Sequence, residues 1–279
     1  MRLGPPFTQF PPAREIGHTG DVELAYAVGQ AMGSELAGVG FDIDFAPVLD
    51  VDSNPDNPII GDRAFGSRPE EVAAFATAFL RGLQAGGVLP CGKHFPGHGD
   101  TDRDSHAELP VVKRSRAALD ATELPPFRAA IAAGVPLLMT AHVLYSALDP
   151  HQPATLSQAI VRNLLRNEMG FSGVVVSDDL EMRAISAQQS IPDAAAASLQ
   201  AGVDWVLICN DLDQSRRAAE RIAAAVARGE LAEGRLVAAV ERIRRLRPPE
   251  PRPGPIALPV PEHEALNARI RTAADRSVS

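Results

Sequence analysis

The segment 92–110, GKHFPGHGDTDRDSHAELP, places three histidines and three aspartates in a stretch whose glycines and prolines exclude a helix. Asp104 and His106 are two residues apart, so in an extended loop their side chains project to the same side. A carboxylate beside an imidazole fixes the imidazole tautomer and raises its basicity, which suits proton transfer near neutral pH. The spacing therefore predicts an acid–base pair on a loop.

A further carboxylate ends an apolar run, VVVSDDL at 174–180. Asp178 and Asp179 stand at the end of this predicted strand, where a rigidly held nucleophile is expected. A carboxylate nucleophile with a proton donor on the opposite side of the substrate is the arrangement of retaining glycoside hydrolysis. The donor in that chemistry is normally a second carboxylic acid, so a histidine in this role is unusual.

Metal binding is a second interpretation of the same segment. His94, His98 and His106 could offer nitrogen ligands beside the neighbouring aspartates. Lys93 directly precedes His94, however, and the glycines and prolines prevent a helix that would bring His94 and His98 to one face. The run DTDRD resembles the start of a calcium loop but lacks the Gly at its sixth position and the Glu at its twelfth. A metal site is therefore disfavoured.

Structural roles are the third interpretation. The whole segment could be a solvated polar loop, and within any functional loop Asp100 and Asp102 could be bystanders. His142 follows another apolar run, and a lone histidine there fits a hydrogen-bonded core residue as well as it fits a site residue.

Short apolar runs alternate with segments of helical periodicity along the chain. The runs lie at 41–51, 88–95, 135–143, 173–180 and 203–209, and the helical segments at 21–38, 69–85, 119–133, 157–168, 193–201 and 213–228. Glycines that can cap a helix stand just before the next strand, at Gly40, Gly87, Gly134, Gly170 and Gly202. This alternation predicts an α/β fold with a parallel sheet.

Polar residues follow each apolar run. This pattern helps to choose between two folds with a parallel sheet, the closed barrel and the doubly wound sheet. In a (β/α)8 TIM-type barrel the active site draws residues from the carboxyl ends of several strands. A doubly wound sheet often carries a glycine-rich phosphate-binding motif, and neither GxGxxG nor GxxxxGK[ST] occurs here. The barrel is favoured, although only five clear strands are visible where eight are needed.

The composition and the apolar runs limit which partners and which cellular compartment are expected for the protein. A net charge of −8 disfavours nucleic acid, because neutralising phosphates requires a basic surface. The N-terminal stretch lacks the apolar core of a signal peptide, and no apolar run is long enough to span a membrane, so a cytoplasmic location is expected. The arginine-dense stretch 216–247 predicts a solvated helix face. We assign 1–247 to the barrel and 248–279, which is Pro-rich and then polar, to a tail with one short helix.

The runs KHFPGHGDTDRDSHAELP and VVVSDDLEM resemble the β-N-acetylglucosaminidases (β-hexosaminidases) of glycoside hydrolase family 3. The similarity extends from PPFTQFPPA near the start, through FDIDFAPVLDV and GDRAFGSRPEEVAAFATAFLRGLQ, to about residue 245. It implies a TIM-type barrel that removes terminal β-linked N-acetylglucosamine with retention of configuration. It also implies that Asp178 is the nucleophile, that His106 is the acid/base held by Asp104, and that Asp179 is structural.

The same resemblance implies the substrate and its contacts. Arg63, Lys93 and His94 match sugar-binding positions of the family, and Arg2 aligns with another sugar-contacting arginine. The implied substrate is N-acetylglucosamine linked to 1,6-anhydro-N-acetylmuramic acid, with or without peptide, from cell-wall recycling. No metal or other cofactor is implied, and a monomer is expected.

The chain departs from the family pattern at its start. Family members begin with about two more βα units, the second of which ends in a DQEGGR motif, and this chain starts after that place. An incomplete barrel that lacks its first one or two βα units is therefore expected, and it would explain the strand deficit. The alternatives are a non-catalytic sugar-binding remnant of the family, a metal-dependent barrel hydrolase, and an assembly in which another chain supplies the missing strands.

Overall fold

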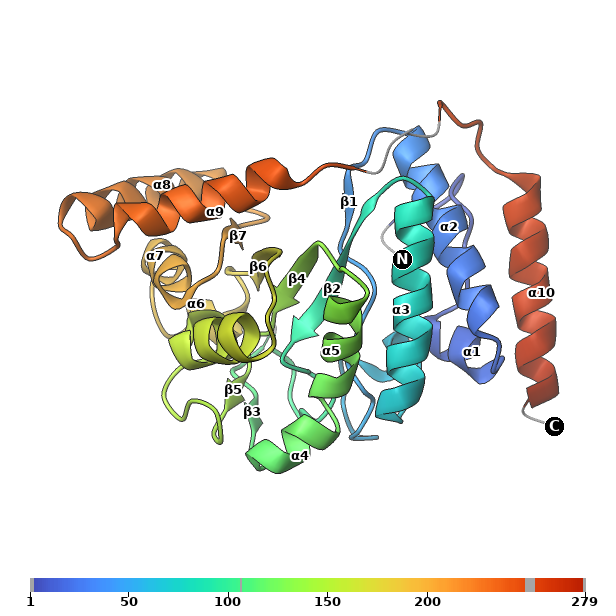
Figure 1. The fold of residues 1–279 in the computed structure, drawn as a ribbon, viewed down its shortest axis with the longest axis horizontal. Coiled ribbons are helices and arrows are strands. Elements are labelled where there is room, and N and C mark those ends of the chain that lie inside the picture. Colours follow the sequence, from blue (N-terminus) through green and yellow to red (C-terminus); the bar gives the residue numbers. More distant parts are fainter. Residues whose placement is uncertain (1–2, 106, 249–253, 278–279) are drawn as a thin grey trace.

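The computed structural model describes residues 3–105, 107–248 and 254–277. Among these residues, five parallel strands form the main sheet: β1 (Ile43–Asp44), β2 (Leu89–Phe95), β4 (Leu137–Thr140), β6 (Val174–Asp179) and β7 (Trp205–Leu207). The strands pair in chain order, so each new strand joins the same growing edge (Figure 1). The short strands β3 (Val111–Val112) and β5 (Leu144–Tyr145) form a separate parallel pair.

Helices join the successive strands. They are α3 (Pro69–Ala85), α4 (Arg116–Ala121) with α5 (Leu124–Ala132), the π-helical segment η3 (Ala159–Glu168), and α6 (Arg183–Ser186) with α7 (Ile191–Ala201). Parallel strands that follow in chain order with right-handed crossovers place their helices on one face of the sheet. The curved sheet with helices along its outer face is a half-barrel, so the predicted α/β class and incomplete barrel are confirmed.

The two faces of the sheet have separate apolar cores. Val88, Leu138 and Val175 point outward and pack in one cluster with buried side chains of α3, α5 and η3. Strand residues between them, such as Leu89 and Val176, point to the other face and form a second cluster. Because side chains alternate along a strand, residues that are adjacent in sequence stabilise opposite faces. This double burial explains why the strands read as nearly continuous apolar runs.

The helices α1 (Ala13–His18) and α2 (Val22–Gly38) precede the sheet, and α2 packs along α3. Glycines make this close approach possible: a Cβ added at Gly29 would lie 2.2 Å from the Phe79 carbonyl oxygen, and one at Gly82 would lie 2.2 Å from the Tyr26 oxygen. No larger side chain fits at either position without a shift of backbone.

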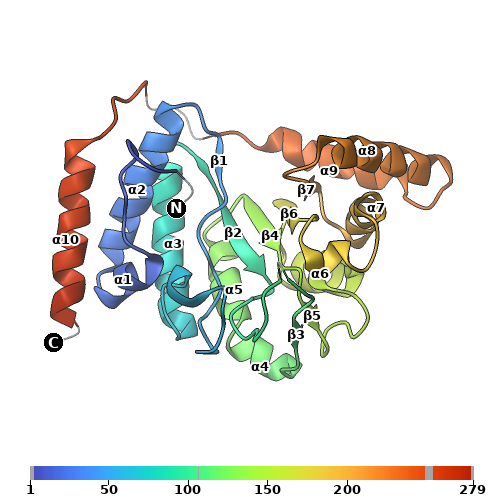
Figure 2. The same ribbon diagram turned by 180° about the vertical axis from the view of Figure 1, so that it is seen from behind.

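The helix α10 (Pro261–Ser277) lies on the outer side of α2 (Figures 1 and 2). Its Ile270 is fully buried, and the His263 ring contacts the buried Glu35 carboxylate at 2.7 Å. The helix is therefore longer and more firmly docked than the short helix expected in 248–279. The boundary at 247 stays a prediction.

The helices α8 (Leu212–Ala227) and α9 (Glu233–Arg245) follow β7 at the opposite end of the molecule from α10 (Figure 1). The prediction of a solvated helix face for 216–247 is wrong at Arg235 and Arg242, whose guanidinium groups reach the buried Asp204 at 3.0 Å. Helical spacing alone does not show where a buried carboxylate will lie.

The glycines predicted to cap helices all have positive φ, from 73° at Gly170 to 123° at Gly202, which confirms the predicted helix ends. None of the helices in the described ranges is long and apolar enough to cross a membrane.

Candidate active site

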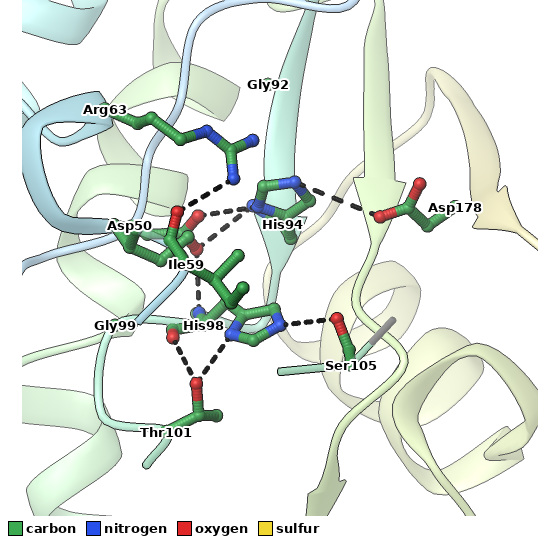
Figure 3. A network of polar contacts seen from close by, with 12 residues as sticks. Asp50, Ile59, Arg63, Gly92, His94, His98, Gly99, Thr101, Ser105 and Asp178 are labelled. Atoms are coloured by element: carbon green, nitrogen blue, oxygen red, sulfur yellow. Dashed lines mark hydrogen bonds and ion pairs between the residues drawn. The ribbon is translucent and has the colours of Figure 1, made fainter. Parts of the chain in front are cut away.

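Polar side chains gather at the carboxyl ends of β2 and β6. Lys93 and His94 lie near the end of β2, and Asp178 lies near the end of β6. The carboxyl ends of parallel strands meet at one edge of a sheet, so His94 and Asp178 become neighbours although they are far apart in the sequence (Figure 3). The peptide bond between Lys93 and His94 is cis.

Asp50 is the centre of this polar network. It is fully buried, and its Oδ1 accepts hydrogen bonds from the backbone N–H groups of His94 (3.1 Å) and His98 (2.7 Å). Its Oδ2 lies 2.7 Å from Nδ1 of His94. Burial opposes ionisation of Asp50, but its contacts with His94 and His98 outweigh that effect and lower its pKa below the ordinary value. Asp50 is therefore an ionised anchor for both histidines.

His94 stands between Asp50 and Asp178. Its Nδ1 contacts Asp50, and its Nε2 points to Asp178 Oδ2 at 4.0 Å (Figure 3). A carboxylate at Nδ1 fixes the ring orientation and favours the tautomer with its hydrogen on that nitrogen. The opposite nitrogen is thereby directed toward the space next to Asp178.

Asp178 is only partly accessible, with 25% of its side chain exposed. Burial disfavours its ionised form, but the imidazoles of His94 and His142 outweigh this effect and lower the pKa of Asp178. Its Oδ1 also accepts the Asp179 N–H at 2.9 Å. The result is an oriented carboxylate that stays ionised near neutral pH, as an attacking group requires.

Cationic groups border the same space. Lys93 is partly buried, and burial first and the nearby Arg63 guanidinium second lower its pKa. Arg63 ends the 3-10 turn η1 (Gly61–Arg63) and donates to the Ile59 carbonyl at 3.1 Å. On β1, burial raises the pKa of Asp44, and Lys93 opposes that shift. The site therefore offers nitrogen donors beside carboxylate acceptors, which suits a ligand rich in hydroxyl and carbonyl oxygens.

His98 organises the loop that follows β2. It is buried, its Nδ1 lies 2.8 Å from Thr101 Oγ1 and its Nε2 lies 3.1 Å from Ser105 Oγ. Asn57 adds a second support, because its Nδ2 donates to the carbonyl oxygens of His98 (2.8 Å) and Gly99 (3.0 Å). The loop is thus anchored from inside by side chains that the sequence interpretation considered only as metal ligands or not at all.

The predicted acid–base pair is only partly described. Asp104 lies on this loop, and its carbonyl oxygen accepts the N–H groups of Ala107 (2.9 Å) and Glu108 (3.0 Å). His106 and Arg2 lie outside the described residues, so the pairing of Asp104 with His106 and the sugar contact of Arg2 stay predictions. In the described ranges, no group of three or more His, Cys, Asp or Glu side chains is arranged to hold a metal ion.

His142 has the surroundings of a core histidine. It is 1% exposed, its Nδ1 contacts Thr155 Oγ1 at 2.8 Å, and its Nε2 contacts the Asp179 carbonyl at 3.0 Å. Burial lowers the pKa of His142. Both ring nitrogens of His142 are therefore used in contacts with the protein and are not free to bind a ligand.

Asp179 faces away from His94. Its Oδ1 accepts the Glu181 N–H at 3.1 Å, and its Oδ2 lies 3.5 Å from the Asn210 amide nitrogen. These contacts connect β6 to the segment after β7.

Sequence reasoning missed the role of Asp50 and the loop-anchoring role of His98. Asp50 ends the apolar run 41–51, and this position was a signal, because a carboxylate there must lie at the same sheet edge as Lys93 and His94. For His98, spacing could not show which way the ring points inside a loop.

Comparisons with known proteins give the family. The family profile "Glycosyl hydrolase family 3 N terminal domain" matches residues 1–246. The curated "Beta-hexosaminidase" of Nitrosomonas eutropha is 42% identical over 215 residues, which cover 75% of this chain and 61% of that protein. The chain thus spans less than two thirds of the length of this relative.

Solved structures agree with the sequence match. A glycoside hydrolase family 3 β-N-acetylglucosaminidase from Paenibacillus sp. str. FPU-7 superposes with a TM-score of 0.92 at 39% identity, over 98% of this chain and 54% of that one. The β-N-acetylglucosaminidase from Thermotoga maritima superposes with a TM-score of 0.80 at 31% identity, over 88% of this chain and 52% of that one.

Proposed function

This chain belongs to glycosyl hydrolase family 3, and we propose that it hydrolyses terminal β-linked N-acetylglucosamine with retention of configuration. The observation that carries the proposal is the Asp50–His94–Asp178 arrangement, which presents an ionised carboxylate beside a ring of fixed orientation at the carboxyl edge of a half-barrel. The β-hexosaminidase relatives supply the class of sugar.

The reaction has two steps. Asp178 attacks the anomeric carbon and forms a glycosyl ester, while His106 gives its proton to the leaving oxygen and Asp104 orients the imidazole. A water molecule then attacks the same carbon from the other side, gives its proton to His106 and displaces Asp178. Two inversions return the product to the β configuration. These steps use only side chains of the chain, so we propose that no metal or organic cofactor takes part.

The proposed substrate contacts are made by the polar side chains near Asp178. Arg63 and Lys93 would donate to sugar hydroxyls and to the acetamide carbonyl, and Arg2 would add a further contact. His94 would accept a sugar hydroxyl hydrogen at Nε2, because Asp50 favours the tautomer with the ring hydrogen on Nδ1. We propose a muropeptide fragment, N-acetylglucosamine linked to 1,6-anhydro-N-acetylmuramic acid with or without peptide, as the substrate of peptidoglycan recycling. The lactyl or peptide carboxylate would need the local cations Arg63 and Lys93, because the net charge of −8 repels anions at long range. We further propose that the protein acts in the cytoplasm as a monomer, without nucleic acid or membrane as partner.

The test is hydrolysis of a chromogenic aryl β-N-acetylglucosaminide by the full 279-residue chain, with Asp178→Asn as the blank. Turnover above the blank, with β-N-acetylglucosamine as the first product by NMR, supports the proposal, and EDTA should leave the rate unchanged. A chain with a native circular dichroism spectrum and no turnover would instead be a sugar-binding remnant. An EDTA-sensitive rate would favour the metal-dependent hydrolase.

A further inference from the structure

His98 lies under the loop 99–108, which we call the catalytic loop because it carries Asp104 and His106. The loop leaves the protein interior at Thr101 and returns to it at Ser105, and both of these residues are buried, whereas Asp102 and Arg103 between them are exposed. The ring of His98 contacts Thr101 through one nitrogen and Ser105 through the other (Figure 3). One side chain therefore holds both points at which the loop enters the core.

The nearby acceptors favour one direction for these bonds. The His98 carbonyl oxygen can only accept, and the Thr101 hydroxyl lies 3.1 Å from it; a hydroxyl that donates there accepts from the His98 ring. We assign the ring hydrogen to Nδ1 of His98 on this basis, which makes Nε2 an acceptor for the Ser105 hydroxyl. Burial lowers the pKa of His98 to about 4, which keeps Nε2 unprotonated at neutral pH. The neutral ring is the form that this pair of contacts requires.

Ser105 connects the loop to the strand of the nucleophile as well. Its carbonyl oxygen accepts the Ala184 N–H of α6 at 3.2 Å, and α6 follows β6 directly. Ser105 is thus bound on one side to the β2 segment through His98 and on the other side to the β6 segment that presents Asp178. The next residue in the chain is His106.

The exposed part of the catalytic loop has weaker support. Arg103 pairs with Glu108 at 2.6 Å, but both side chains are more than half exposed, and such pairs add little. The buried His98–Ser105 contact is better shielded from solvent than this pair, so it can set the position of the segment around residue 105.

We propose that His98 is a positioning residue that latches the catalytic loop to the end of β2 by accepting the Ser105 hydroxyl hydrogen. The latch acts on the segment around Ser105, the residue that precedes His106 in the sequence, and His98 does not itself contact the substrate. This inference rests on the proposed function for its effect on catalysis, but the latch itself has a readout that needs no turnover.

The first experiment is hydrogen–deuterium exchange of peptides that cover the catalytic loop, in the full chain with Ser105→Ala. Loss of the hydroxyl should raise the exchange rate of the loop amides about fivefold, the factor that corresponds to one ordinary hydrogen bond, and leave peptides of β4 unchanged. Ser105→Thr keeps the hydroxyl and should restore protection. Arg103→Gln is the matched control for the exposed pair and should have little effect.

The second experiment compares two substrates whose leaving groups differ in their need for a proton. The comparison distinguishes a positioning role of the His98–Ser105 contact from a general loss of active-site structure. For Ser105→Ala, kcat/KM for an unsubstituted phenyl β-N-acetylglucosaminide should fall about fivefold, because that leaving group needs a proton from His106. For the 2,4-dinitrophenyl glycoside, which needs none, kcat/KM should stay within about twofold of the wild type. Equal losses for both substrates would overturn the positioning role.

Variants of His98 identify which ring nitrogen matters. His98→Gln places an amide near the position of Nε2 and should keep most of the protection, whereas His98→Asn reaches only the Nδ1 position and should behave as Ser105→Ala does. Ser105→Ala added to His98→Asn should then cause no further increase.

The outcomes distinguish this inference from the proposed function. Unchanged loop exchange in Ser105→Ala overturns the latch, whatever the activity. Faster exchange in a chain whose wild type hydrolyses neither glycoside supports the latch and overturns the hydrolase.

Discussion

Two buried aspartates lie at opposite ends of the same sheet, and their partners differ in kind. Asp50 lies at the carboxyl edge and is held by backbone N–H groups and by the His94 imidazole. Asp204 directly precedes β7, at the amino end of that strand, and is held by Arg166, Arg235 and Arg242 and by the Val175 N–H. Both have fully buried side chains.

The partners decide what each aspartate can do. The guanidinium groups around Asp204 are permanently charged and join η3 and α9 to the start of β7, so this cluster stabilises the fold. Asp50 instead orients a ring whose other nitrogen remains directed at the site. The partners of Asp204 are cations from neighbouring elements, which fits a stabilising role. The partner of Asp50 has a second ring nitrogen directed at the site, which fits the proposed role in catalysis. This division agrees with the general roles of the two ends of a barrel.

The largest effect is expected at Asp178, the proposed nucleophile at the carboxyl edge. Asp178→Asn should lower hydrolysis of the aryl glycoside by more than about a thousandfold, because the amide cannot form the glycosyl ester. The urea midpoint should change little, since the side chain is partly exposed. Asp179→Asn is the neighbouring control, and a greater loss in that variant would remove Asp178 from the nucleophile role.

The amino-end cluster should show the opposite pattern. Asp204→Asn leaves Arg166, Arg235 and Arg242 without their anion and should lower the free energy of unfolding by about 3–5 kcal/mol, as measured by urea denaturation. The folded fraction should retain kcat/KM. Asp193→Asn breaks an exposed pair with Arg221 and should cost no more than about 1 kcal/mol. If both variants lost the same free energy of unfolding, the Asp204 cluster would have no special stabilising role at the amino end of the sheet.

Asp50→Asn tests the carboxyl edge itself. It should lower kcat/KM about a hundredfold, because an amide N–H facing Nδ1 of His94 disfavours the tautomer that Asp50 selects. The amide oxygen of the asparagine can still accept the backbone N–H groups of His94 and His98, so we expect the free energy of unfolding to fall by only about 1 kcal/mol. Asp100→Asn, which breaks the partly exposed pair with Arg114, is the control. A variant that loses several kcal/mol and no activity would place Asp50 in the same class as Asp204.

Glu123 is a third kind of buried carboxyl group, because it has one hydrogen bond from a side chain and no cationic partner within hydrogen-bond distance in the described residues. Its Oε1 accepts the Ser53 hydroxyl at 2.9 Å, and its Oε2 has no hydrogen-bond partner in the described part of the chain. Burial raises the pKa of Glu123 to about 7, against the opposing effect of Ser53. The native state therefore binds more protons than the unfolded state between about pH 4.5 and 7, and stability falls as pH rises through that window.

Glu123→Gln should remove this dependence. The variant and the wild type should be about equally stable near pH 4.5, and the variant should become more stable by on the order of 3 kcal/mol at pH 8. Urea midpoints across this range are the measurement, with the exposed Glu108→Gln as control. A constant difference between variant and wild type would mean that Glu123 is ionised throughout.

The sequence predicted much of the architecture because the determinants are local. The strand runs 88–95 and 173–180 contain β2 and β6, and helix α3 has the predicted bounds 69–85. Glycines at helix ends require positive φ whatever surrounds them, and double burial makes strands apolar. The edge at which Lys93, His94 and Asp178 meet follows from parallel topology alone.

Tertiary structure decided the directions of side chains. Nothing in the spacing of GKHFPGHGDT shows that Nδ1 of His94 contacts Asp50, 44 residues earlier, or that the His98 ring turns inward to Ser105. Arg235 and Arg242 have the periodicity of an exposed helix face, yet a buried carboxylate on another element draws them in. Local periodicity determines which element forms and where it ends, whereas hydrogen-bond partners depend on which distant groups the packed fold leaves within about 3 Å.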